Sequence, residues 1–274
     1  MSSPPTVYVA VPTGNIKEYA SLYMLASLRN IYYPPEKLSI NVAITDRGDE
    51  KSKGFIKRFR NLVANAEMPF PFHIHVTKPT EQEVKRWGPY CAVIKNLHHL
   101  RLDFLDGDAD YFWVLGGDNP PESGTLRKLL KLEADVAGAL ILQRPLRGRQ
   151  FDPDGDRDAN IIKPICWQYV WTPRDVEKRR DLEPKLRHSL LRSWIEMPPM
   201  RISVTHNELM RECNFGSGCS LAKRTVMEHI GYYLGNGYHS EDIHFGQWAN
   251  FLGFTTCLDP NTRCRHFDPD GRLY

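Results

Sequence analysis

Short apolar runs alternate with segments of helical periodicity in the first part of the chain. The apolar runs have strand length and cover residues 7–11, 38–45, 72–76 and 111–115. Between them, apolar side chains recur every three or four positions, as in an amphipathic helix, over residues 18–30, 55–64 and 91–105. Strands and helices that alternate in this way favour an α/β fold with a mainly parallel sheet covered on both faces.

The regular pattern weakens between about residues 143 and 211. This segment is rich in charged residues, and only one short amphipathic helix, at 186–194, is predicted within its charged part. Order returns after it, with helices predicted at 224–230 and 242–252 and a strand at 254–258. We interpret residues 1–274 as a single domain that carries an irregular insertion at about 143–211, because the aromatic side chains of the insertion need burial.

The insertion leaves two interpretations open for each of its notable features. Trp167, Tyr169 and Trp171 alternate as in a strand with one buried face, or they stack on an acceptor sugar or a base. The mixed charges of residues 174–192 are typical of a solvated helix face. Alternatively, their basic members form a patch for acidic lipid headgroups or for a polynucleotide.

Composition narrows the class of protein. The chain is 41% hydrophobic and 25% charged, which is typical of a globular protein. Its 36 Lys and Arg against 33 Asp and Glu give a net charge of +3, too balanced for broad wrapping of nucleic acid. The chain has six cysteines without a C-x-x-C pair, no leading signal peptide and no apolar run of membrane-spanning length. We therefore expect a cytoplasmic protein with free thiols and no transmembrane segment; the oligomeric state is not indicated.

Polar clusters follow three of the predicted strands. They are Pro-Thr-Gly-Asn at 12–15, Asp-Arg-Gly-Asp at 46–49 and Gly-Gly-Asp-Asn at 116–119. Any one of them alone is typical of a turn. Because the carboxyl ends of parallel strands meet at one edge of a sheet, where such folds bind ligands, the three together predict a site.

Individual residues in and near these clusters carry the candidate chemistry. Asp118, with glycines beside it, suits a divalent cation and a diphosphate that approach the backbone, although a plain turn is the alternative. Ser240 followed by Glu241 and Asp242 is either a capped helix start or a general base held at a helix N-terminus. His266 is either structural or a metal ligand that faces a carboxylate.

The order of these motifs along the chain resembles that of the GT-A glycosyltransferases. The resemblance covers roughly residues 7–266, except the insertion, and implies a Rossmann-like GT-A fold. It is carried by a strand ending in V-P-T, an acid after the second strand, and a strand followed by G-G-D. The remaining motifs are N-F-G-S-G-C at 214–219, the E-D pair at 241–242 and a late histidine.

The resemblance assigns the donor-binding residues. It implies that Pro12 and Thr13 cradle the base and ribose of a nucleotide, that Asp46 contacts the base and that Lys95 lies near the nucleotide. The glycine segment of Gly216, Ser217 and Gly218 resembles the one that lines the donor sugar and the acceptor.

The resemblance also implies a metal site and a catalytic base. Gly116, Gly117 and Asp118 occupy the place of the family's D-x-D motif, with Gly116 in place of the first acid. Asp118 and His266 would hold Mn²⁺ or Mg²⁺. Glu241 and Asp242 resemble the acidic pair of inverting enzymes, whose aspartate is the base.

The implied activity is that of a metal-dependent, inverting hexosyltransferase. It would move a sugar from a UDP- or GDP-sugar to an acceptor hydroxyl on a glycan, a lipid-linked molecule or a nucleic acid. The alternative is a GT-A-like protein that binds a sugar nucleotide or a polynucleotide with little or no catalysis. A sugar-nucleotide pyrophosphorylase is disfavoured, because residues 12–15 lack the Gly-rich, Arg-bearing loop that such an enzyme needs after its first strand.

Overall fold

The computed structural model describes residues 3–143, 163–164, 166–169, 172–196, 200–202, 208–233 and 240–267. Most of its strands belong to one sheet. The strands of this large sheet are β1 (Val7–Thr13), β2 (Leu38–Thr45), β3 (Phe72–Thr77), β4 (Tyr111–Leu115), β5 (Val136–Gln143), β6 (Lys163–Pro164), β9 (Met210–Arg211), β11 (Cys219–Lys223) and β12 (Thr256–Cys264). Their order is β3-β2-β1-β4-β11-β5-β12-β9, with β6 paired to β5.

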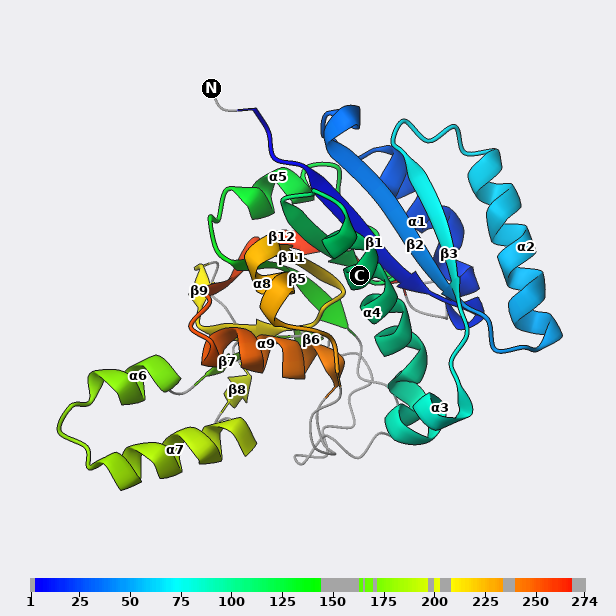
Figure 1. The fold of residues 1–274 in the computed structure, drawn as a ribbon. Coiled ribbons are helices and arrows are strands. Elements are labelled where there is room, and N and C mark those ends of the chain that lie inside the picture. The colour runs from blue at the N-terminus through cyan, green and yellow to red at the C-terminus, as the bar shows by residue number, and fades with distance from the viewer. Residues whose placement is uncertain are drawn as a thin grey trace.

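The sheet is mainly parallel, as predicted. Strands β1, β2, β3 and β4 are parallel neighbours, and β12 is parallel to β5. Strand β11 lies antiparallel between β4 and β5, so β5 and β12 run in the same direction as β1. Because β12 comes from the last part of the chain, both ends of the sequence contribute to one sheet (Figure 1).

Helices cover both faces of this sheet (Figure 1). They are α1 (Ser21–Arg29), α2 (Glu50–Ala64), α3 (Glu81–Trp87), α4 (Cys91–Asp106), α5 (Thr125–Leu130), α8 (Arg224–His229) and α9 (Glu241–Phe251). Three short 3-10 helices accompany them, η1 (Asn15–Ala20), η2 (Pro35–Lys37) and η3 (Gly88–Tyr90).

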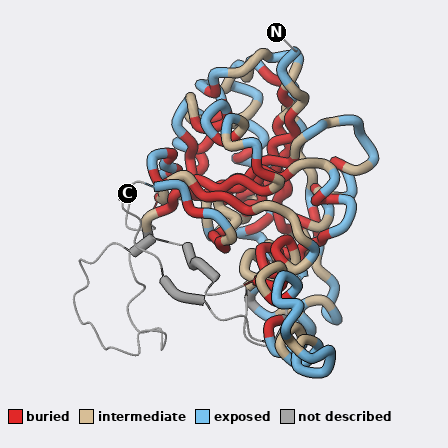
Figure 2. The backbone as a smooth tube through the Cα atoms, turned by 90° about the vertical axis from the view of Figure 1, so that its left-hand side faces the viewer, coloured by how far each residue is buried: buried red, intermediate tan, exposed pale blue. Residues whose placement is uncertain are grey.

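Side chains along β1 point alternately to the two faces of the sheet, and the apolar core accordingly has two layers. Val9 and its alternate neighbours pack with apolar residues of α1, α2 and α5 on one face. Tyr8 and Ala10 pack with α4, α8 and α9 on the other. The strands are accordingly buried through the centre of the molecule (Figure 2). Each large apolar side chain buried in this way stabilises the fold by roughly 1.5–3 kcal/mol.

The insertion contributes two helices, and two of its strands form a second, smaller sheet with a strand that follows the insertion. The sheet has the order β10-β7-β8 and consists of β7 (Cys166–Tyr169), β8 (Met200–Ile202) and β10 (Cys213–Phe215). Helices α6 (Pro173–Lys178) and α7 (Pro184–Glu196) project as an arm in Figure 1. Trp194 on α7 is fully buried and its carbonyl accepts a hydrogen bond from Gln247 on α9, 3.2 Å away. The predicted strand and helix are thus present here, whereas Trp171 lies outside the described residues.

Several predicted boundaries differ from the structure for local reasons. The helix predicted at 18–30 is divided into the end of η1 and α1, and the non-helical dihedral angles of Lys17 place a kink inside η1, just before the predicted start. Helix α2 begins five residues before the predicted start, where the side chain of Asp49 accepts a hydrogen bond from the amide of Ser52 at 2.7 Å. Strand β5 was not predicted, since its apolar run leads directly into the irregular segment.

Two sequence expectations concern the whole molecule. None of the helices in the described part of the chain has the length and apolar character needed to cross a bilayer. The cysteines whose side chains are described are buried, free thiols at positions 91, 213, 219, 257 and 264.

Candidate functional site

A pocket of about 290 Å³ lies at the carboxyl ends of the central strands. This is the edge at which α/β sheets bind ligands. Its walls come from segments far apart in the sequence: residues 12–17 after β1, the turn after β4, the loop between β10 and β11, the start of α9 and the chain after β12.

The pocket brings together most of the residues predicted from the sequence. Those that line it are Pro12, Thr13, Gly116, Asp118, Gly216, Ser217, Gly218, Glu241, Asp242 and His266. Gly117, Asp46 and Lys95 do not line it.

Asp46 and Lys95 are engaged elsewhere. Asp46 accepts hydrogen bonds from the Gly48 amide at 2.8 Å and the Ser52 hydroxyl at 2.9 Å, and these bonds hold its pKa below the usual value. Lys95 pairs with Glu83 of α3, with 2.5 Å between Nζ and Oε1. Asp46 therefore organises the turn before α2, and Lys95 ties α3 to α4.

The glycines after β4 allow close packing. A Cβ on Gly117 would lie 2.5 Å from Thr13 Oγ1, so glycine lets this turn approach the end of β1. A Cβ on Gly116 would overlap the side chain of Asn119. Asn119 also donates from Nδ2 to the carbonyl of Arg265 at 3.3 Å. The Asn119 side chain thus fills the space that an acid at position 116 would need.

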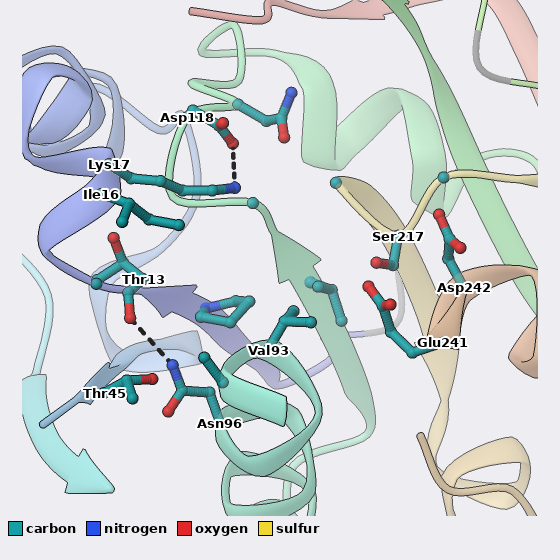
Figure 3. Close-up of a pocket in the computed structure, with 18 of the residues that line it drawn as sticks. Thr13, Ile16, Lys17, Thr45, Val93, Asn96, Asp118, Ser217, Glu241 and Asp242 are labelled. Carbon is teal, nitrogen blue, oxygen red and sulfur yellow. Dashed lines mark hydrogen bonds and ion pairs between the residues drawn. The ribbon is translucent and has the colours of Figure 1, made fainter. Parts of the chain in front are cut away.

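Asp118 is the centre of one end of the pocket. Its Oδ1 lies 2.6 Å from Nζ of Lys17, which comes from η1 (Figure 3). Its Oδ2 accepts a hydrogen bond from the Tyr19 hydroxyl at 3.4 Å and lies 3.8 Å from Nε2 of His266. The Asp118 carbonyl accepts a hydrogen bond from the Phe267 amide at 2.8 Å, which holds the chain after β12 against this turn.

The Asp118 end has the donor chemistry for a divalent cation. A carboxylate oxygen and an imidazole nitrogen are ligands that Mn²⁺ accepts, and both side chains are largely buried. The described residues contain no group of three or more such ligands. Two protein ligands still suffice for an ion that also takes phosphate oxygens and water. Asp118 and His266 therefore fit a metal ion that binds together with a phosphate ligand.

Glu241 and Asp242 form the other end of the pocket (Figure 3). Glu241 is only 8% exposed, and its Oε2 has no hydrogen-bond partner among the described residues. Asp242 Oδ1 accepts hydrogen bonds from the Ser240 hydroxyl and from the Ile243 amide, the latter at 2.8 Å. Ser240 is the N-cap residue by position, but its hydroxyl contacts Asp242 and makes no capping bond.

Burial makes both carboxyl groups hold their protons more tightly. Burial, together with the neighbouring Asp242 charge, raises the pKa of Glu241 to about 8, against a lowering effect of Lys17. Burial also raises the pKa of Asp242, but hydrogen bonds from Ser240 and from the backbone of Ile243 and Ser217 favour its ionised form. Both carboxyl groups therefore bind a proton more tightly than an ordinary carboxyl group, and Asp242 also has hydrogen-bond donors that favour its ionised form.

A close contact fixes the position of this carboxyl pair. Asn214 on β10 donates from Nδ2 to the Ile243 carbonyl on α9 at 2.9 Å. A Cβ on Gly246 would overlap the Asn214 side chain, so glycine allows β10 and α9 to approach. The start of α9 is thereby held against the loop that contains Ser217.

Comparison with solved structures identifies the fold. The mannosyltransferase PcManGT from Pyrobaculum calidifontis, in complex with GDP-Man and Mn²⁺, matches 98% of this chain with a TM-score of 0.51 and 16% identity. The chain has the GT-A glycosyltransferase fold. It spans 59% of the length of PcManGT.

Other solved structures are similar at lower scores. Residues 1–349 of S. aureus TarS, in complex with UDP-GlcNAc, match 94% of this chain and 57% of that chain, with 13% identity and a TM-score of 0.48. A197 from STIV matches 98% of this chain and 93% of that chain, with 12% identity and a TM-score of 0.45. No protein-family model and no curated protein matches the sequence.

Some lining residues of this GT-A pocket were not predicted. Lys17, Asn96 and Thr45 are the main ones, since they lie outside the polar clusters from which the site was predicted. Asn96 is buried and donates from Nδ2 to the Thr13 carbonyl at 3.0 Å, which joins α4 to β1. It directly follows Lys95, and successive helical residues face different directions. The sequence signal that could have distinguished Asn96 from Lys95 is the position of each residue around the helix predicted at 91–105.

Proposed function

We propose that the protein is a glycosyltransferase that moves a hexosyl group from a nucleotide-diphosphate sugar to an acceptor hydroxyl. The observation that carries the proposal is a single pocket with two chemically different ends. Asp118, which pairs with Lys17, stands at one end, and the buried Glu241 and the half-buried Asp242 stand at the other. The GT-A fold is compatible with this assignment, and PcManGT was solved with GDP-Man and Mn²⁺.

The Asp118 end would bind the donor. Thr13 and Asn96 line the adjoining wall, where the nucleoside would lie. Asp118 and His266 would hold a divalent cation, which supplies neutralising charge to the diphosphate leaving group. The narrow packing between Gly117 and Thr13 keeps the end of β4 and the end of β1 in fixed relation for this task.

The other end would accept the proton. Asp242 takes the proton of the acceptor hydroxyl while the hydroxyl oxygen bonds to the anomeric carbon of the sugar. The bond from that carbon to the diphosphate oxygen breaks on the opposite face, and its electron pair leaves with the diphosphate. One displacement of this kind inverts the anomeric configuration. Hydrogen bonds from the Ser240 hydroxyl and the Ile243 amide favour the ionised form of Asp242, which is the form that a base needs.

A second candidate is a protein that binds a sugar nucleotide without transferring the sugar. The observation behind it is Asn119, whose side chain occupies the space of the first acid of the D-x-D motif.

Calorimetry with UDP and GDP, with and without Mn²⁺, combined with a donor-hydrolysis screen, tests the proposal. We expect one nucleotide to bind and the matching donor sugar to be hydrolysed slowly. Binding without hydrolysis or transfer favours the second candidate, and the absence of binding under every condition contradicts both.

A further inference from the structure

Lys17 reaches into the pocket from the turn that follows β1. Its backbone is fixed there, because its amide donates to the Gly14 carbonyl at 2.9 Å. Its side chain extends to Asp118 Oδ1, 2.6 Å away, and is 32% exposed (Figure 3). The ammonium group therefore stands at the surface of the pocket and within reach of a ligand.

The charge of Lys17 acts on both ends of the pocket. It pairs directly with Asp118, and it also opposes the rise in the pKa of Glu241. The other basic lining residues are Arg47, which is exposed, and His266, on the far side of Asp118. Among the described lining residues, Lys17 is thus the cation that pairs with Asp118 and also acts on Glu241.

Among the described residues, Asp118 is the only carboxylate at this end of the pocket, since Asn119 excludes an acid at position 116. One ammonium group balances that single charge. A divalent cation that binds Asp118 beside His266 brings two positive charges to the same carboxylate, so its presence opposes the ion pair with Lys17. The metal ion and the lysine therefore compete for Asp118.

We propose that Lys17 binds the diphosphate of the donor, and that it pairs with Asp118 only until the donor and its metal ion arrive. The proposal rests on the proposed function, which supplies the diphosphate. An ammonium group has three N–H donors and a compact charge, and only one donor is needed for Asp118. The others are available to phosphate oxygens. The ion pair with Asp118 thus holds the Lys17 side chain in the pocket when no donor is bound.

The test compares wild type with Lys17→Met, which keeps the length of the side chain and removes its charge. Lys57→Met is the matched control, because Lys57 is exposed on α2 and away from the pocket. Calorimetry measures the binding of UDP and GDP in EDTA and in Mn²⁺. Electron paramagnetic resonance measures the affinity for Mn²⁺ without nucleotide. Lys17→Gln is the second variant if Lys17→Met unfolds.

The two measurements are expected to move in opposite directions. Nucleoside diphosphate binding in EDTA should weaken by about tenfold or more in Lys17→Met, because charge-assisted hydrogen bonds to phosphate are lost. Mn²⁺ binding without nucleotide should tighten by a similar factor, because Asp118 loses its competing partner. Lys57→Met should resemble wild type in both.

The outcomes separate this inference from the proposed function. If wild type binds nucleotide and Lys17→Met binds it equally well in both buffers, Lys17 is not a diphosphate ligand. If the affinity of Lys17→Met for Mn²⁺ is unchanged or lower than that of wild type, Lys17 and the metal ion do not compete for Asp118. If wild type binds no nucleotide at all, the proposed function fails together with the diphosphate assignment, and the Mn²⁺ measurement alone decides whether the competition exists.

Discussion

The two ends of the pocket hold their carboxyl groups in opposite ways. Asp118 faces a lysine at 2.6 Å. Glu241 and Asp242 stand beside each other, and no ion pair to either is found among the described residues. A carboxylate that already has a cation partner is suited to exchange that partner for another cation. A buried pair without one holds protons more tightly and is suited to proton transfer. The surroundings of a carboxyl group thus determine whether it is suited to bind a cation or to transfer a proton.

The largest effect is expected from Asp242→Asn, which removes the base and keeps the shape. Transfer should fall by about 10²–10⁴-fold, because an amide does not take the acceptor proton. Steady-state turnover with the donor found in the screen measures this. Asp108→Asn, at an exposed position outside the pocket, is the control. Near-normal turnover in Asp242→Asn would remove Asp242 as the base and erase the contrast between the two ends.

His266→Ala tests the other end. Affinity for Mn²⁺ in the presence of nucleotide should fall by about tenfold or more, since an imidazole ligand is lost. The pH dependence of turnover, scaled to saturating metal, should stay as in wild type, because the carboxyl pair is untouched. An altered pH profile with unchanged metal affinity would show that the two ends are not chemically separate.

Gly116→Ala tests whether Asn119 leaves no room for the first acid of the D-x-D motif at position 116. The new Cβ would overlap Asn119, so the free energy of unfolding should fall by about 1–3 kcal/mol. Gly124→Ala is the control, because a Cβ there meets no atom within 4 Å. Adding Asn119→Ala should recover part of the loss in Gly116→Ala. Denaturant unfolding measures all three; equal stability of the two glycine variants would mean that Asn119 does not exclude larger residues.

Glu241→Gln tests the carboxyl pair through the pH dependence of stability. The pKa of Glu241 is about 8 in the fold and 4.5 as its ordinary value. Between these values the folded state binds more protons than the unfolded state, so wild-type stability falls as pH rises and levels off above 8. Glutamine does not ionise. The Tm of Glu241→Gln should therefore exceed that of wild type by about 10 °C or more above pH 8 and match it near pH 4. An equal difference at both pH values would contradict burial of the proton.

The sequence predicted the sheet better than the contacts within the site. Alternating apolar runs place β1, β2 and β4 correctly, because burial on both faces leaves a strong signal. Motif order also placed Asp118, Asp242 and His266 in one pocket. The spacing of residues in the sequence does not reveal which side chains come into contact in the folded site. Asn119 against Gly116 and Lys17 against Asp118 are contacts of that kind.

The weakest predictions concern residues whose neighbours decide their direction. Lys95 was expected near the nucleotide, yet Glu83 on another helix holds it at 2.5 Å, and Asn96 lines the pocket instead. Strand β5 has the apolar character of a buried strand, but the irregular residues after it obscured its end. Contacts of this kind depend on tertiary packing, which a single sequence does not show.

The division of labour between the two ends is tested most directly by nucleotide calorimetry on Asp118→Asn and Asp242→Asn side by side in Mn²⁺. We expect Asp118→Asn to weaken binding of the preferred nucleoside diphosphate by about tenfold or more, whereas Asp242→Asn binds it as wild type does. Equal weakening in both variants, or weakening in Asp242→Asn alone, would contradict this division of labour.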